Sequence, residues 1–120
     1  MIYMSAEDAA LLIATMLHRS GKTRARISDQ TLKVISKRKR LKTAFRKEVV
    51  DWAEEFGVIL YPLDRGGYGL LSASSLEGAT PLRSGAHIKA ELAEFKKNGT
   101  IDHNALYTEL GFEVEEEDDE

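Results

Sequence analysis

The chain has 120 residues, a formal net charge of −3 and no cysteine. This length allows one domain with a modest core, and the lack of cysteine excludes disulfide bonds and cysteine-ligated zinc. The charge is uneven: twelve of the seventeen Lys and Arg residues lie in 19–47, where Asp29 is the only acid, which gives that segment a net charge of +11.

The first predicted helix begins after Ser5 and runs to about His18. The Ser5 hydroxyl can accept a backbone N–H at the helix start, and Gly21 follows where a left-handed cap is common. The apolar face of this helix should bury five residues: Ala9, Leu12, Ile13, Met16 and Leu17. A short extended segment over 25–27 is predicted next.

Ser28 is a plausible cap for the second predicted helix, which is short and should bury Leu32 and Ile35. The basic residues 37–40 then predict a turn. The third helix, over 41–56, has the strongest helical signal, because its apolar residues recur at spacings of four, four, three and four. These residues are Leu41, Phe45, Val49, Trp52 and Phe56, so we expect the tryptophan to pack in the core.

A β-hairpin is predicted after this helix. The segments 58–63 and 68–74 are β-like, and 64–67 supplies turn residues between them. Pro62 has no N–H to donate to a neighbouring strand, so the first of these strands should lie at a sheet edge or contain a bulge.

Two more helices are predicted after Gly78. The first spans about 85–97 and carries Ile88, Leu92 and Phe95, and the second spans 102–110 and carries Leu106 and Leu110. Overall we expect an α+β fold, mostly α with a small β-hairpin, as a single domain over 1–112.

The chain ends in an acidic segment, where seven of the eight residues in 113–120 are Asp or Glu. Without it the net charge changes from −3 to +4. Such a segment buries too little apolar surface to fold, so we expect a disordered acidic tail. The tail could improve solubility, or it could fold over the basic residues and compete with nucleic acid.

No segment predicts membrane insertion or secretion. The apolar residues 1–4 are followed by acids at Glu7 and Asp8, which does not suit a signal peptide. The longest apolar stretches are too short to span a bilayer, and we expect a cytoplasmic protein.

The order of these elements resembles the winged helix-turn-helix family over roughly 6–74. The resemblance depends on element order, not on a sequence fingerprint, and the helices after Gly78 have no counterpart. In that family the third helix lies in the DNA major groove, and the hairpin, or wing, often touches the backbone or minor groove. The resemblance therefore implies that 41–56 is the recognition helix and that 64–67 is the wing tip.

The charge order of the third predicted helix also favours nucleic acid. Cations crowd its first turns and acids its second half, which is the reverse of what the helix dipole prefers. A phosphate near the basic end would supply the missing counter-charge. A solvated face with internal charge pairs is the alternative.

Nine residues are predicted to contact nucleic acid. Thr43, Arg46 and Lys47 point away from the apolar stripe and should face the groove, where Arg can bind guanine edges. Residues 37–40 more naturally bind phosphates, and Arg65 at the hairpin tip could reach the backbone or minor groove. The full set is Lys37, Arg38, Lys39, Arg40, Lys42, Thr43, Arg46, Lys47 and Arg65.

Arg24, Arg26 and Tyr68 each have two interpretations. The two arginines alternate along one strand face, where they could bind nucleic acid or lie in solvent. The tyrosine could stack on a base or pack inside the wing.

Catalytic and metal sites have no support in the sequence. The histidines, His18, His87 and His103, fall on separate predicted elements, and His87 with Glu91 at i, i+4 is one pair rather than a metal site. The glycines in 66–69 lie between two strands, whereas a phosphate-binding loop would open a helix. We expect no enzyme activity, no metal and no cofactor.

The sequence therefore predicts a small DNA-binding protein that regulates transcription, binds double-stranded DNA and forms a homodimer through spare apolar helix faces. The alternative is a protein-binding adaptor or inhibitor, for example of mobile-element origin, that targets a nucleic-acid-handling machine.

Overall fold

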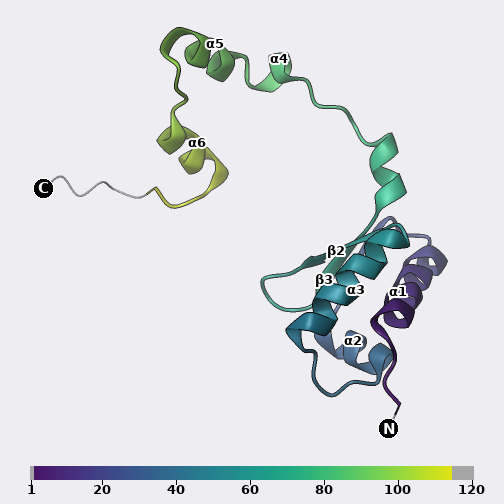
Figure 1. Cartoon of the computed structure of the whole chain (residues 1–120). Coiled ribbons are helices and arrows are strands. Elements are labelled where there is room, and N and C mark those ends of the chain that lie inside the picture. Colours follow the sequence, from purple (N-terminus) through teal and green to yellow (C-terminus); the bar gives the residue numbers. More distant parts are fainter. Residues whose placement is uncertain (1, 115–120) are drawn as a thin grey trace, which may run out of the picture. The chain divides into compact units, whose positions relative to one another are not determined.

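A computed structural model of the chain describes residues 2–114 (Figure 1). Contacts divide it into two units, Met1–Ala79 and Thr80–Glu120. The first unit contains α1 (Ala6–Ser20), β1 (Arg24–Ile27), α2 (Asp29–Ser36), α3 (Thr43–Glu55), β2 (Val58–Pro62), β3 (Tyr68–Ser72) and the 3-10 helix η1 (Ala73–Gly78). The second contains α4 (Ser84–His87), α5 (Lys89–Asn98) and α6 (His103–Leu110). The predicted α+β fold with a majority of helix is confirmed.

Local capping explains where the helices begin and end. Ser5 Oγ accepts the backbone N–H of Asp8, and Ser28 Oγ accepts that of Thr31, each at 3.1 Å. Both predicted N-caps are therefore confirmed. Gly21 ends α1 in the left-handed conformation with φ 71°, which a glycine adopts without steric cost.

The three strands form one antiparallel sheet in the order β1-β3-β2. The predicted hairpin is β2 and β3, and the extended segment predicted over 25–27 joins it by pairing with β3. In this order β2 has a free edge, as expected from Pro62, which cannot donate a ladder hydrogen bond.

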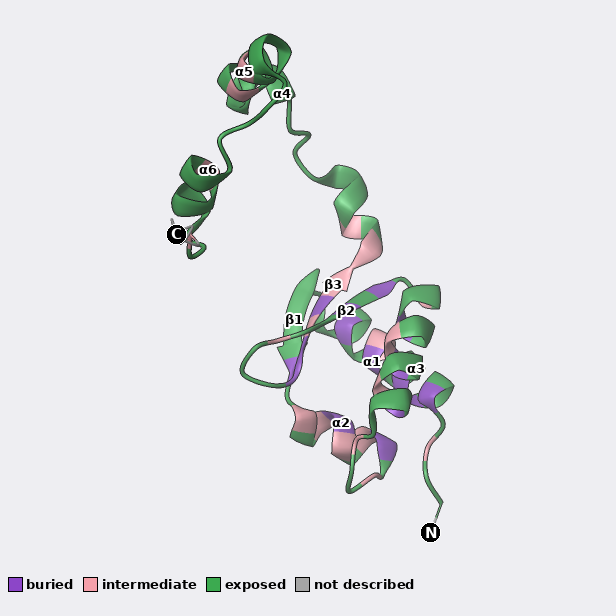
Figure 2. Ribbon diagram, turned by 60° about the vertical axis from the view of Figure 1, so that its left-hand side comes forward, coloured by how far each residue is buried: buried purple, intermediate pink, exposed green. Residues whose placement is uncertain are grey.

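The core of the first unit lies between α1, α3 and one face of the sheet (Figure 2). α1 packs against α3 and α2, and α3 packs against β2. The largest contributions come from ten buried side chains: Ile13, Leu17, Ile27, Leu32, Phe45, Val49, Val58, Leu60, Tyr68 and Leu70. Small residues complete the core at Ala6, Ala9, Ala10 and Ala53.

Three residues that we expected in the core are exposed instead: Leu12, Met16 and Trp52. Trp52 is 39% exposed and stacks on Phe56, with 6.1 Å between the ring centroids. Small residues, among them Ala9, Ala10 and Ala53, fill the buried positions of α1 and α3, and the indole ring packs on Phe56 instead of entering the core. The tryptophan therefore lies at the rim of the helix pair.

The second unit has no buried residue in the part that the structure describes, 80–114. The single helix predicted over 85–97 is divided at Ile88, whose φ of −127° is outside the helical range, so His87 and Glu91 lie on different helices. The final predicted helix is present as α6. Its N-cap is Asp102, whose Oδ1 accepts the backbone N–H of Ala105 at 3.0 Å.

We expected a single domain over 1–112, and the contacts divide the chain into two units at Ala79; all residues of the buried core cluster belong to the first of them. The predicted disordered tail over 113–120 falls mostly outside the described residues. No helix in the described part is long and apolar enough to span a bilayer.

Candidate nucleic-acid interface

The connection between α2 and α3, residues 37–42, is the most cationic part of the structure, and we call it the basic loop. Lys37 closes α2 with a left-handed backbone, φ 61°, which is uncommon for a residue with a side chain. Four cations of the loop are exposed: Lys37, Lys39, Arg40 and Lys42. Between residues 2 and 114 the only ion pair is Arg46 with Asp29, so these four cations have no carboxylate partner there.

Arg38 is the exception within the basic loop, because its guanidinium packs inward. Its Nη2 donates a hydrogen bond to the carbonyl oxygen of Met4 at 3.1 Å. The guanidinium carbon lies 3.9 Å from the Phe45 ring centroid and 5.3 Å from that of Tyr3, which are cation–π distances. The N–H of Met4 in turn bonds the carbonyl oxygen of Ser36 at 3.0 Å. We predicted a phosphate contact for Arg38, but this geometry favours a structural role in fixing the loop.

The Arg46 guanidinium is also engaged in hydrogen bonds within the protein. Its Nη1 contacts Asp29 Oδ1 at 3.0 Å and the Tyr68 hydroxyl at 3.2 Å, and its Nε donates to the carbonyl oxygen of Leu41 at 3.2 Å. The hydrogen bond from Arg46 lowers the pKa of Asp29, and the bond to Asp29 raises the pKa of Arg46. Arg46 thus links α3 to the start of α2 and to β3, and it is less available for the groove contact that we expected.

Thr43 and Lys47 remain exposed on the first turns of α3. Lys42 occupies the N-cap position without a side-chain hydrogen bond to the helix, so the first N–H groups of α3 receive no capping oxygen from it. The later turns carry exposed carboxylates at Glu48, Asp51, Glu54 and Glu55. Only the beginning of α3 therefore suits a polyanion.

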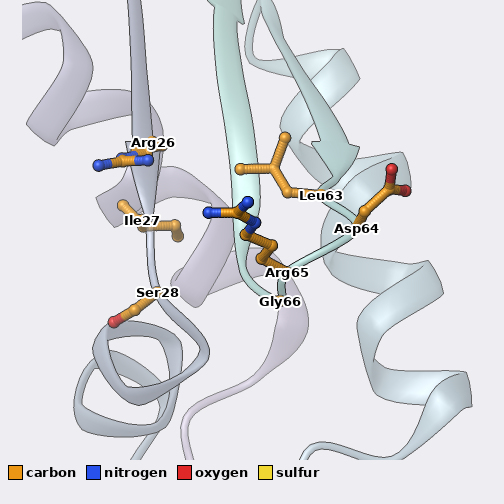
Figure 3. A pocket seen from close by; sticks show the side chains of 7 residues that line it. All are labelled: Arg26, Ile27, Ser28, Leu63, Asp64, Arg65 and Gly66. Atoms are coloured by element: carbon orange, nitrogen blue, oxygen red, sulfur yellow. The ribbon is translucent and has the colours of Figure 1, made fainter.

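The hairpin tip lies beside the end of β1, where residues of both line a pocket of about 510 Å³ (Figure 3). Gly67 has φ 77°, and a Cβ there would collide with the carbonyl oxygen of Ile27, so the tip approaches β1 as closely as a backbone allows. Arg65 is exposed at the tip, and Figure 3 shows its side chain and that of Asp64 pointing to different sides of the turn.

Tyr68, at the start of β3, is buried, which fits packing within the hairpin rather than base stacking. Arg24 and Arg26 are exposed on β1.

Sequence reasoning did not foresee the internal partners of Arg38 and Arg46, although Asp29, the single acid among twelve cations, was a visible signal for one of them. Within the described residues no group of three His, Asp or Glu side chains could hold a metal ion.

The structure therefore places seven of the nine predicted contacts at the surface and ties two of them, Arg38 and Arg46, into the protein. Comparisons of the chain with protein-family models, with curated proteins and with solved structures gave no match.

Proposed function

We propose that this chain is a small double-stranded DNA-binding protein of the winged helix-turn-helix type, acting in transcription regulation. The observation that carries the proposal is the basic loop, whose four exposed cations have no carboxylate partner within residues 2–114. Unpaired cations held close together repel each other, and a polyanion relieves this repulsion while its condensed counterions are released.

The winged-helix part of the proposal is supported by topology. In the first unit the order is helix, strand, helix, helix, strand, strand, and the first strand pairs with the last in the sheet β1-β3-β2. In this order the basic loop precedes α3 and the hairpin follows it, so α3 has cationic residues on both sides of it in the sequence.

The charges on α3 specify how such a protein would dock. Carboxylates on the later turns would be repelled if the helix lay lengthwise against phosphates. Docking by the start of the helix avoids this repulsion and brings Thr43 and Lys47 to the groove, with Lys39 and Arg40 on the backbone. Arg65 would then contact a second stretch of backbone from the hairpin tip.

Binding of a labelled 20-base-pair duplex across a salt series tests this proposal. We expect Lys39→Glu with Arg40→Glu to weaken binding at least about tenfold at low salt and to flatten the salt slope by about 1.8, the value for two lost phosphate contacts. The matched control is Arg19→Glu with Lys22→Glu. It changes the net charge by the same amount, but at the C-terminal end of α1, whereas Met4, which contacts Arg38 of the basic loop, lies before the N-terminal end. Equal losses in both double variants would mean that affinity follows net charge and not the basic loop.

A second candidate, a protein-binding adaptor or inhibitor of a nucleic-acid-handling machine, is favoured by the exposed apolar side chains of the second unit, such as Leu82 and Phe112. Exposed apolar surface of this kind often marks a protein interface. Capture of lysate proteins with nuclease present separates the two candidates. Partners that survive nuclease and the Lys39→Glu, Arg40→Glu change would favour the adaptor.

A further inference from the structure

The face of the sheet that points away from the core is apolar and uncovered. Along β2 the buried residues Val58 and Leu60 alternate with exposed Ile59 and Tyr61, as expected for a strand with one face in the core. The register places Leu71 of β3 beside Ile59. Together these side chains line a groove of about 600 Å³ whose walls are almost wholly apolar.

Two arginines border this groove on the β1 side. Arg24 pairs with Leu71 and Arg26 pairs with Gly69, so both side chains lie on the same outer face as Tyr61, which also pairs with Gly69. Gly69 between Arg26 and Tyr61 has no side chain, and Leu63 Cδ2 lies over it, 3.5 Å from the place that a Cβ would occupy. The surface is thus an apolar trough with cations along one edge.

The chain also contains a helix that suits this trough. α5 has ten residues, too few to be stable alone in water, and its apolar side chains are exposed: Leu92 by 50% and Phe95 by 55%. Helical periodicity places Glu91 and Glu94 along one side of this apolar face and Lys89 and Lys96 along the other. The helix is therefore an apolar stripe with carboxylates along one edge.

We infer that α5 of a second copy of this chain docks in the outer sheet groove, and that two chains exchange α5 reciprocally to form a symmetric dimer. Each of the two surfaces is exposed within its own unit, and a two-fold exchange covers both in each copy. The inference stands independently of nucleic-acid binding.

Charge sets the orientation of the docked helix. Glu91 and Glu94 are about 5–6 Å apart at Cβ on a helix, and Arg24 and Arg26 are about 7 Å apart on a strand. The carboxylate edge of α5 can therefore lie over β1 with Leu92 and Phe95 against Tyr61 and Leu71. Reversing the direction of the helix, with the same apolar face on the sheet, would place Lys89 and Lys96 against the arginines, which like-charge repulsion disfavours.

Sedimentation equilibrium of the nuclease-treated full chain over a concentration series tests the dimer. We expect a monomer–dimer equilibrium that Tyr61→Asp weakens at least about tenfold, because a charge would enter an apolar contact. The matched control is Val34→Asp on α2, where the wild-type side chain is 59% exposed. A monomer at every concentration, or equal effects of Tyr61→Asp and Val34→Asp, would overturn the inference.

A charge exchange tests the partners and shows whether α5 acts between chains. Arg26→Glu alone and Glu91→Arg alone should each weaken the homodimer about tenfold, since every contact then joins like charges. Mixing the two variants should restore wild-type association. In the mixed dimer the two substituted side chains meet each other in one contact with their charges exchanged, and the wild-type Arg26 and Glu91 meet in the other. A mixture that associates no better than either variant alone would overturn the exchange. This is also the result expected if α5 contacted the groove of its own chain, because mixing cannot repair a contact within one chain.

Discussion

Gly67 determines how closely the hairpin tip can approach β1. Gly66 has a positive φ as well, 93°, but a Cβ there would meet nothing closer than Asp29 Oδ2 at 3.8 Å. We expect Gly66→Ala to cost about 1 kcal/mol of unfolding free energy from the left-handed backbone alone. Gly67→Ala should cost about 3 kcal/mol or more, because a collision with the Ile27 carbonyl adds to that strain. Urea denaturation measures both, and equal costs would exclude the collision.

Asp29 and Arg46 give the fold a dependence on pH. Because the pKa of Asp29 is lower in the folded chain than in the unfolded one, its stabilisation is present above the unfolded value of about 3.9 and is lost as pH falls through the folded value. The side chains are 38% and 32% exposed, so solvent screening limits the effect to about 1 kcal/mol or less.

We therefore expect Asp29→Asn to lower the unfolding free energy at pH 7 and to have a smaller effect at about pH 2.5, because that pH lies below the unfolded pKa and the stabilisation is being lost there as the pH falls toward the folded pKa. Urea denaturation of both proteins at the two pH values measures this. A destabilisation of the same size at both values would mean that the carboxylate charge is not what Arg46 recognises.

Two arginines show what charge counting cannot predict. The sequence places Arg38 and Arg46 in the same basic segment as Lys39 and Lys47, and nothing in the composition separates them. Arg38 meets Tyr3 and Phe45 only because the loop between α2 and α3 turns back toward the chain start. Loop conformation depends on tertiary contacts, so the exposed cations could be predicted as a group but not sorted one by one.

At the scale of elements, Arg38 organises the basic loop through its contact with the Phe45 ring. We expect Arg38→Met to lower the unfolding free energy by about 1–2 kcal/mol through the lost cation–π contact and the lost hydrogen bond to Met4. Lys39→Met removes the same charge from the neighbouring exposed position and should leave stability unchanged while weakening DNA binding. Thermal unfolding and duplex titration of both variants check this, and a larger loss of stability for Lys39→Met would exclude the proposed role of Arg38.

The elements that the sequence predicted well are those with local signals. Ser5 and Ser28 start helices through hydrogen bonds three residues away, and the turn at 64–67 joins adjacent strands. The pairing of β1 with β3 joins residues more than forty positions apart, and no local signal specifies it. Trp52 was misplaced for a related reason, because the space beside α3 depends on the alanines of α1.

At the scale of the whole molecule, the two units carry opposite charge. Residues 1–79 contain thirteen Lys and Arg against nine Asp and Glu, a net charge of +4, and residues 80–120 contain four against eleven, a net charge of −7. A nearby polyanion is attracted to the first unit and repelled by the second, wherever the second lies within a Debye length. The second unit should therefore lower the affinity for DNA, most strongly at low salt.

A chain that ends at Ala79 tests this opposition. Every buried residue of the described chain lies before that point, so at protein concentrations where the full chain is monomeric the melting temperature should change by no more than about 2 °C. The affinity for duplex DNA at low salt should rise several-fold, and the gain should shrink as added salt screens the lost repulsion. The control is a full-length chain with Gln and Asn at the acidic positions of 113–120. It removes the charge of this segment but keeps α4–α6, so it separates the effect of charge from the effect of the helices. If this neutral chain binds like the wild type while the shortened one binds more tightly, α4–α6 obstruct the basic surface by their bulk, and charge is not the cause.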